Sequence, residues 1–163
     1  MNKIQLDHHD ADLLRLLAED GQTTPAKLSE HLSVTAPTVR SRIKNLMQKG
    51  VLRIAGLLDP AAVRGVTIAL VGLTLSKHGF LGEKLDQITQ LPNVNWAVVV
   101  TGRYDIIVEV VLSDDTADLY RFLDEALPRI GDIASSESFV VMRSRRKWVL
   151  LPEAFAVSQQ KTP

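Results

Sequence analysis

The sequence predicts an α+β protein, in which a helical N-terminal part precedes a ferredoxin-like β-α-β-β-α-β part. Two observations lead to this prediction. Apolar residues recur at helical spacing through the first fifty residues, and β-branched runs replace them after Gly65. In addition, the segment Ser33–Arg53 carries five basic residues and no acidic one, although the whole chain has 19 Lys and Arg against 19 Asp and Glu. The positive charge is therefore local.

Two helices are expected before residue 33. The first lies in LDHHDADLLRLLAEDG, where Asp7 or Asp10 can cap the start and Gly21 marks the stop. The second lies in TTPAKLSEHLS, where the Thr24 hydroxyl caps a helix with Pro25 at its first position. Both place leucines on one face, which is typical of helices that pack on a shared core.

A third helix is expected to run from its cap at Thr35 to a stop at Gly50. At 100° per residue, Val39, Ile43 and Leu46 share one face, which should point to the core. The opposite face is polar and cationic. After the stop, residues 51–58 are expected to be extended and to form a short wing.

The rest of the chain predicts four strands and two helices. The strands are expected at 66–76, 94–101, 104–113 and 134–150, and the helices at 80–91 and 115–130, the latter capped by Asp114 or Asp115. This order places both helices on one face of an open sheet. The strands are apolar on both faces, and no further helix remains to cover the second one. A second copy of the chain is therefore expected to cover it in a homodimer.

The third helix is predicted to be the recognition helix of a helix-turn-helix that binds double-stranded DNA. In this motif the second helix lies in the major groove, and its side chains contact base edges. Arg can bind guanine and Asn can bind adenine through paired hydrogen bonds. The residues predicted to contact bases are Thr38, Ser41, Arg42 and Asn45, and those predicted to contact phosphates are Arg40, Lys44, Lys49 and Arg53. The alternative is a solvated basic face that binds nothing.

Other candidate sites carry weaker patterns. The basic run Arg143–Lys147 is interpreted as the solvated end of the last strand rather than a second DNA-binding patch. The four histidines show no metal-binding spacing and there is no cysteine, so neither a metal site nor a cofactor is expected. No apolar run approaches the roughly 18 residues of a membrane span. The start of the chain is too polar for a signal peptide, so a cytoplasmic protein without a membrane partner is expected.

Residues 5–150 resemble the Lrp/AsnC family, also called feast/famine regulatory proteins. The resemblance rests on the N-terminal segment from LDHHDADLL to LMQKGVL, the linking LLDPAAVRG and the later VTGRYDIIVEVV, in this order. It implies a winged helix-turn-helix joined to a ferredoxin-like ligand-sensing domain. It also implies a transcriptional regulator that responds to an amino acid or related metabolite, as a dimer and often a tetramer of dimers.

The expected division of the chain follows from these segments. It comprises a DNA-binding domain at 1–52, a linker or wing strand at 53–65, an effector-sensing and oligomerisation domain at 66–151, and a flexible tail at 152–163.

The corner TGRYD is the candidate effector site. Gly102 permits a backbone conformation closed to other residues and exposes an N–H group. An amino-acid carboxylate could bind N–H groups near Gly102 and Arg103, and Asp105 could accept from its ammonium group. The family resemblance implies that effectors bind near this corner, so the candidate effector-binding residues are Thr101, Gly102, Arg103, Tyr104 and Asp105. A hairpin turn without a ligand is the alternative.

Two other classes of function remain open at this point. One is an enzyme on the same scaffold, a tetrapyrrole (sirohaem-type) decarboxylase, which would need a basic pocket containing histidine. The other is an assembly or sensing module whose helix-turn-helix no longer binds DNA.

Overall fold

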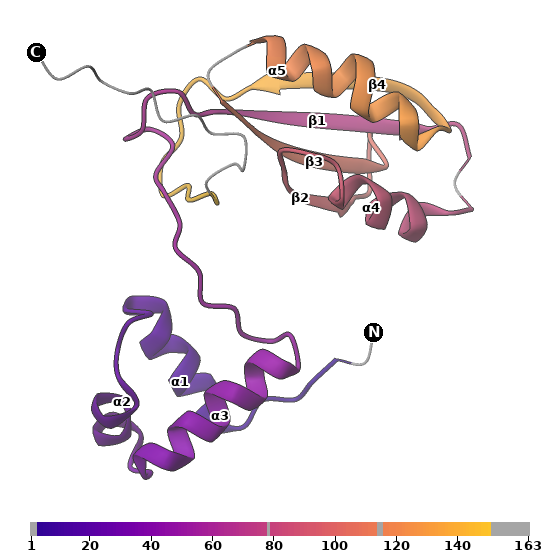
Figure 1. Cartoon of the computed structure of the whole chain (residues 1–163). Coiled ribbons are helices and arrows are strands. Elements are labelled where there is room, and N and C mark those ends of the chain that lie inside the picture. Colours follow the sequence, from indigo (N-terminus) through magenta and orange to yellow (C-terminus); the bar gives the residue numbers. More distant parts are fainter. Residues whose placement is uncertain (1–2, 78, 114–115, 151–163) are drawn as a thin grey trace, which may run out of the picture. The chain divides into compact units, whose positions relative to one another are not determined.

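The computed structural model describes residues 3–77, 79–113 and 116–150 (Figure 1). The chain divides into two compact units, Met1–Ala55 and Gly56–Pro163. The tail expected at 152–163 and the helix cap expected at Asp114 or Asp115 lie outside the described residues.

The first unit, here called the helical unit, contains the three expected helices. They are α1 (His8–Glu19), α2 (Pro25–Leu32) and α3 (Ala36–Gln48). Each begins after an N-cap whose side chain accepts a backbone N–H, and the three caps are Asp7, Thr24 and Thr35. Asp7 rather than Asp10 therefore caps α1. The turn between α2 and α3 has three residues and begins at Ser33, which adopts the left-handed conformation with φ 52°.

One apolar cluster holds the three helices together. The buried members are Leu13, Leu17, Leu28, Leu32, Val39 and Leu46. Val39 and Leu46 belong to the predicted core face of α3, and half-buried Ile43 packs against the same cluster. The opposite face of α3 is consequently turned to solvent.

The second unit, here called the sheet unit, has the predicted β-α-β-β-α-β order. Its elements are β1 (Thr67–Leu75), α4 (Leu81–Thr89), β2 (Val94–Val99), β3 (Ile106–Leu112), α5 (Thr116–Arg121) and β4 (Ile133–Val140). After α5 the helix continues as a π-helical turn, Phe122–Ala126, and a 3-10 turn, Leu127–Ile130. The strands form one antiparallel sheet in the order β2-β3-β1-β4. This is the ferredoxin-like topology.

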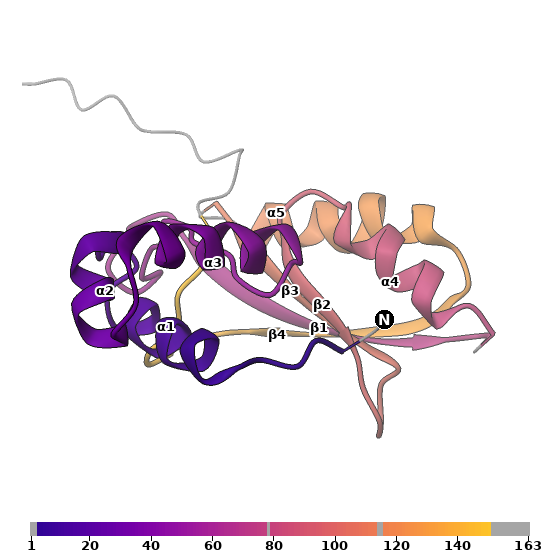
Figure 2. The ribbon, with the colours of Figure 1, turned by 90° about the horizontal axis from the view of Figure 1, so that it is seen from below.

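Both helices cover the same face of the sheet, as predicted (Figure 2). Val71 and Val108, which are paired across β1 and β3, pack there with Ile88 of α4 and Phe122 after α5. The other face, here called the open face, carries alternate residues of the same strands. On it Leu70 pairs with Phe139 and Val98 pairs with Ile107. No helix covers this face within the described residues.

Two sequence-based expectations differ from the structure. The last strand was expected over 134–150, but β4 ends at Val140 and residues 142–148 are irregular. The wing expected over 51–58 does not form a strand in residues 51–57. Instead Leu58 pairs with Val149 through two backbone hydrogen bonds of 2.9 and 3.0 Å. A short pattern of apolar residues does not reveal which distant segment will pair with it. The end of the last strand and the pairing of residues 51–58 therefore could not be predicted from the sequence.

Candidate nucleic-acid interface and effector corner

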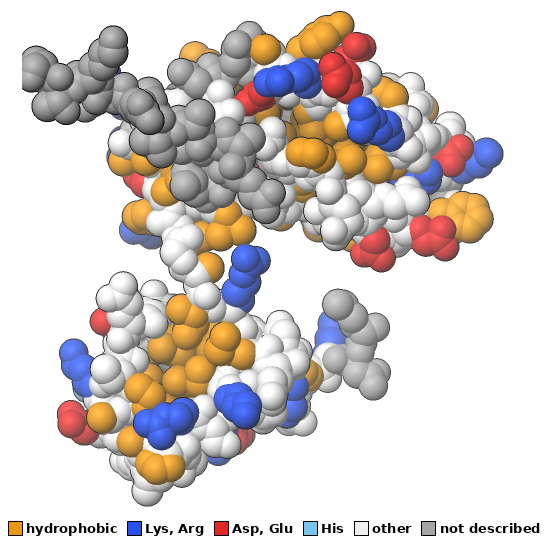
Figure 3. All heavy atoms as spheres, in the orientation of Figure 1, with side chains coloured by type: hydrophobic (Ala, Val, Ile, Leu, Met, Phe, Trp, Pro, Cys, Tyr) orange, Lys and Arg blue, Asp and Glu red, His pale blue; other side chains and the backbone are white. Residues whose placement is uncertain are grey.

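The outer face of α3 presents most of the predicted DNA contacts to solvent. The exposed residues among them are Thr38, Arg40, Ser41, Lys44, Asn45 and Lys49, and Arg53, which follows the helix, is exposed as well. None of the cations Arg40, Lys44 and Lys49 forms an ion pair with the residues that the structure describes. In the view of Figure 3 the helical unit shows several Lys and Arg side chains around an apolar area. Unpaired cations beside hydroxyl and amide groups suit a surface that binds phosphates and base edges.

Arg42 is placed differently from the other predicted DNA contacts. Its guanidinium lies between two carboxylates, with Nη1 2.7 Å from both Asp7 Oδ2 and Asp10 Oδ1. Its side chain is only 26% exposed. Hydrogen bonds first to Asp7 and then to Asp10 raise the pKa of Arg42. The structure thus uses Arg42 to tie α3 to the start of α1, and its predicted base contact stays a prediction.

The same contacts act on the cap of α1. The backbone N–H of Asp10, and after it the Arg42 guanidinium, hold the pKa of Asp7 below its usual 3.8. The carboxylate of Asp7 therefore both caps α1 and faces α3 at 2.7 Å. The sequence indicated Asp7 and Asp10 only as alternative caps, because an ion pair between residues 35 positions apart leaves no local signal.

The TGRYD corner has the backbone that the sequence predicted, but Asp105 has a structural partner. Gly102 adopts φ 126°, which other residues rarely do, and an added Cβ there would meet open space. The Asp105 carboxylate accepts from the backbone N–H of Leu75 at 2.8 Å. This bond ties the corner to the end of β1. In Figure 2 the β2–β3 hairpin points away from α4 and α5.

Tyr104 lies across the neighbouring strand. Its ring covers Gly72 so closely that a Cβ on Gly72 would come within 2.7 Å of it. The Tyr104 hydroxyl donates to Glu137 of β4, and this hydrogen bond raises the pKa of Tyr104. Arg103 also pairs with Glu137, at 2.9 Å. Arg103 and Tyr104 are thereby held on the open face at one end of the sheet.

A buried carboxylate lies on the open face, and sequence reasoning missed it. Glu109 of β3 is 2% exposed. Its two oxygens accept from Asn95 Nδ2 at 2.7 Å and pair with Lys147 Nζ at 2.6 Å. The same ammonium group lies 5.8 Å from the ring centroid of Trp96. This cluster fixes the chain near residue 147 onto the sheet.

The contact of Tyr104 with Gly72 and the buried Glu109 were both missed, although each had a weak signal in the sequence. Gly72 interrupts an otherwise apolar strand, which often marks the close approach of another group. Glu109 is the only charged residue between Ile106 and Leu112. Neither signal identifies the partner, because Tyr104 and Lys147 come from distant positions of the chain.

Described residues of the sheet unit line two surface cavities. One, of about 290 Å³, lies between the start of β2 and the helix that begins with α5, and its lining includes Leu91, Asp118, Phe122 and Arg129. Asp118 already has partners there: burial acts to raise its pKa, but the hydrogen bonds that it accepts from Ser113 and Arg121 together outweigh burial and lower the pKa. The other, of about 240 Å³, lies beside Arg143.

The described residues contain no group of three or more His, Asp or Glu that could hold a metal ion. None of the helices in this part of the chain is long and apolar enough to cross a membrane.

Comparisons with known proteins match both units. Residues 6–53 match a winged helix-turn-helix DNA-binding model, and residues 68–148 match the Lrp/AsnC ligand binding domain. The HTH-type transcriptional regulator PYRAB01370 of Pyrococcus abyssi is 32% identical over 90% of this chain and 91% of its own length.

Solved structures share the fold. The crystal structure of PH0061 has a TM-score of 0.78 at 23% identity, covering 91% of this chain and all of its own. A regulator from Neisseria meningitidis, NMB0573, solved in complex with L-Met, has a TM-score of 0.70 at 23% identity, covering 91% of this chain and 97% of its own.

Proposed function

This chain belongs to the Lrp/AsnC family of transcriptional regulators, and we propose that it acts by placing the outer face of α3 in the major groove of double-stranded DNA. It is a DNA-binding regulator that responds to a small-molecule ligand, and it is not an enzyme. The alternative of a tetrapyrrole decarboxylase is not supported, because the relatives are named as regulators of transcription. We place its action in the cytoplasm.

The exposed polar face of α3 is the observation that supports DNA reading by this helix. Thr38, Ser41 and Asn45 stand beside one another on it and can hydrogen-bond to base edges. Arg40, Lys44 and Lys49 flank them and lack ion-pair partners among the described residues, so they remain available for phosphates.

Variants of α3 separate base reading from phosphate binding. Duplexes selected by the wild-type protein from a random pool serve as probes. Asn45→Ala should lose about 1–3 kcal/mol of discrimination at one base pair. Lys44→Ala should weaken all duplexes alike and lower the log–log salt slope by about 0.9. Arg15→Ala, which removes an exposed cation from α1, is the matched control. A salt slope of zero for the wild-type protein would mean that the helix-turn-helix no longer binds DNA.

Arg42 needs a separate test, because it can act in two ways. If it contacts a base, Arg42→Ala relaxes the preference at one position, whereas Asp10→Asn leaves preference intact. If it acts only by holding α1 against α3, Asp10→Asn causes the same defect as Arg42→Ala. Selection from the random pool with each variant distinguishes these outcomes.

We infer that the effector is an amino acid or a close relative and that it binds at the TGRYD corner. Two observations support an amino-acid effector: the match to a ligand-binding domain, and the complex of the Neisseria regulator with L-Met. Backbone N–H groups at Gly102 and Arg103 would bind the carboxylate. Asp105 would contribute to binding the ammonium group in addition to its bond with Leu75. Thr101 and Tyr104 would border the site.

Thermal melting against the twenty amino acids tests this effector site. A ligand at about 100 times its Kd should add about 2.7 kcal/mol of stability. Gly102→Ala should abolish that gain, because alanine disfavours φ 126°. The control is Gly82→Ala, an exposed position in α4 where an added Cβ meets nothing within 4 Å. If Gly102→Ala responds like the wild type, the effector binds elsewhere.

We also propose that a second copy of the chain covers the open face, giving a homodimer and, by likeness to the family, a tetramer of dimers. The supporting observation is the exposed apolar surface on that face, where Trp96, Val98 and Phe139 are 37%, 41% and 48% exposed. Phe139→Asp should shift the protein toward monomer in light scattering. Tyr120→Asp, at a 64% exposed position on α5, should not. Equal behaviour of the two variants would argue against this interface.

A further inference from the structure

Three arginines beyond the end of β4 stand on a loop that is fixed at both ends. Val141 donates its N–H to Ile68 at 2.8 Å on one side of the loop. On the other side, Lys147 pairs with Glu109 and Val149 pairs with Leu58. The segment between these anchors, Met142–Arg146, is here called the basic loop. Because its ends are held, a ligand would order only a few further residues when it binds.

The charge on the basic loop is not neutralised within the described residues. Arg143, Arg145 and Arg146 are exposed and form no ion pair there. Lys147 differs, since its charge is taken up by Glu109. The run therefore divides into one structural cation and three available ones. The run was expected at the solvated end of the last strand; the three arginines are exposed as expected, but β4 has already ended at Val140, so they lie on an irregular segment and not on a strand.

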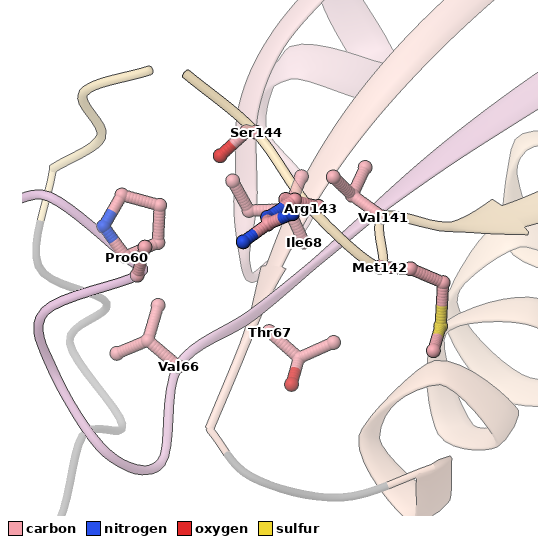
Figure 4. A pocket seen from close by; sticks show the side chains of 9 residues that line it. Pro60, Val66, Thr67, Ile68, Val141, Met142, Arg143 and Ser144 are labelled. Carbon is pink, nitrogen blue, oxygen red and sulfur yellow. The ribbon is translucent and has the colours of Figure 1, made fainter. Parts of the chain in front are cut away.

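The surroundings of the loop add a niche of suitable chemistry. A cavity of about 240 Å³ is bordered by Arg143 and Ser144 on one side and by Pro60, Val66 and Thr67 on the other. Figure 4 shows the nitrogen atoms of Arg143 facing the open space between Pro60 and Ser144. A guanidinium beside a hydroxyl group is a favourable partner for a phosphate oxygen.

The turn on the other side of the cavity does not neutralise the positive charge of the basic loop. It runs through residues 60–65 and carries one more exposed cation, Arg64. Its acidic neighbour, Asp59, accepts from the backbone N–H of Ala61 at 2.9 Å. Together, the described residues of this turn and of the basic loop therefore carry four exposed arginines (Arg64, Arg143, Arg145 and Arg146) beside one carboxylate, that of Asp59.

We propose that the basic loop is a second DNA-binding surface, which binds the phosphate backbone flanking the recognition site without reading bases. The occupant follows from charge complementarity and from the DNA-binding activity of the chain. The connector from Lys49 to Leu57 has nine residues, which span at most about 30 Å when extended. The basic loop can therefore reach DNA next to a site bound by α3. The proposal rests on DNA binding by the helical unit, which supplies the specific contact.

Salt dependence on two lengths of DNA tests the proposal. Both probes share a core selected from a random pool. The short one is trimmed to the bases that determine selectivity, and the long one carries three helical turns on each side. The variant is Arg143→Gln, Arg145→Gln and Arg146→Asn together. Asparagine is chosen at position 146 because its φ is 57°, which asparagine tolerates.

On the long duplex the triple variant should lower the log–log salt slope by about 2.7, or 0.9 for each lost phosphate contact. On the short duplex the slope should not change. A matched pair of single variants controls for net charge: Arg145→Gln should act on the long duplex, whereas Arg129→Gln, which also removes an exposed arginine of the sheet unit, should not. An unchanged slope for the triple variant, or equal effects of the two single variants, would overturn the proposal.

Two other outcomes are distinguishable. If Lys44→Ala changes the slope on neither duplex while the triple variant still does, recognition by α3 fails but the basic loop stands. If the triple variant alters the oligomeric state in light scattering without DNA and leaves every salt slope unchanged, the loop binds an acidic surface of another copy, and the proposal is wrong.

Discussion

The two units of this chain complete their cores to different degrees. The helical unit closes its core within itself, because the apolar faces of α1, α2 and α3 meet in one cluster and the outer face of α3 is polar. The sheet unit covers one face of its sheet with α4 and α5 and leaves Trp96, Val98 and Phe139 exposed on the other. The first unit therefore offers a polar surface to a charged ligand. The second retains apolar surface for another protein chain.

The units also differ in where they place charge. Every buried member of the helical core is apolar, whereas the open face of the sheet contains buried Glu109 with Asn95 and Lys147. The helical unit should consequently respond most to lost volume. The sheet unit should respond to lost charge partners and to close contacts on the open face. Four substitutions test this contrast, in order of decreasing expected effect.

Leu28→Ala should have the largest effect. Leu28 is fully buried in the helical core, so its truncation should cost about 2–5 kcal/mol. Hydrogen exchange of α2 should report this loss. Both tryptophans, Trp96 and Trp148, lie in the sheet unit, so the fluorescence transition should stay in place. Leu57→Ala, at a 51% exposed position, is the control. A parallel shift of the fluorescence transition would show that the units unfold together.

Lys147→Met should follow. It leaves the buried Glu109 carboxylate with Asn95 but without its cation. Since Lys147 is 30% exposed, solvent screens part of the pair, and we expect about 2 kcal/mol of destabilisation in the fluorescence transition. Adding Glu109→Gln should recover part of this loss. Lys77→Met, which breaks a mostly exposed pair with Asp132, should change little. Similar losses in the two lysine variants would mean that burial of Glu109 is unimportant.

Gly72→Ala tests the contact under Tyr104. The new Cβ would lie 2.7 Å from the ring, so the ring must move and about 1–2 kcal/mol should be lost. Combined with Tyr104→Ala, the same substitution should cost much less, because the obstacle is gone. Gly56→Ala, where an added Cβ meets nothing within 4 Å, is the control. Additive losses in the double variant would argue against the contact. The measurement is the unfolding free energy of the wild type, of Gly72→Ala, of Tyr104→Ala and of the double variant.

The smallest effect concerns pH and the helical unit. The folded pKa of Asp7 lies below 3.8 because of the Asp10 backbone N–H and Arg42. The stabilisation from the Asp7 charge is therefore present above about pH 4 and disappears as the pH falls through the folded pKa. Asp7→Asn keeps a capping side chain but removes the charge. The stability difference between wild type and Asp7→Asn should be constant above pH 5 and shrink in acid. A difference that grows in acid would contradict the assignment.

The sequence by itself determined the elements and their order. Caps at Thr24 and Thr35 and the apolar spacing of α3 are local signals, because capping and helical periodicity involve residues a few positions apart. The change to β-branched runs likewise predicted the ferredoxin-like topology. Glycine has no side chain, and this local property predicted the positive φ at Gly102.

Only the tertiary structure decided which charged side chains have ion-pair partners and where β4 ends. Arg42 meets Asp7 and Asp10, Lys147 meets Glu109, and Tyr104 crosses Gly72, all between residues distant in the chain. In a sequence, a cation paired with a buried carboxylate or with a helix-capping carboxylate looks the same as a cation that is free on the surface. Which of them can bind a ligand depends on neighbours that only folding brings together.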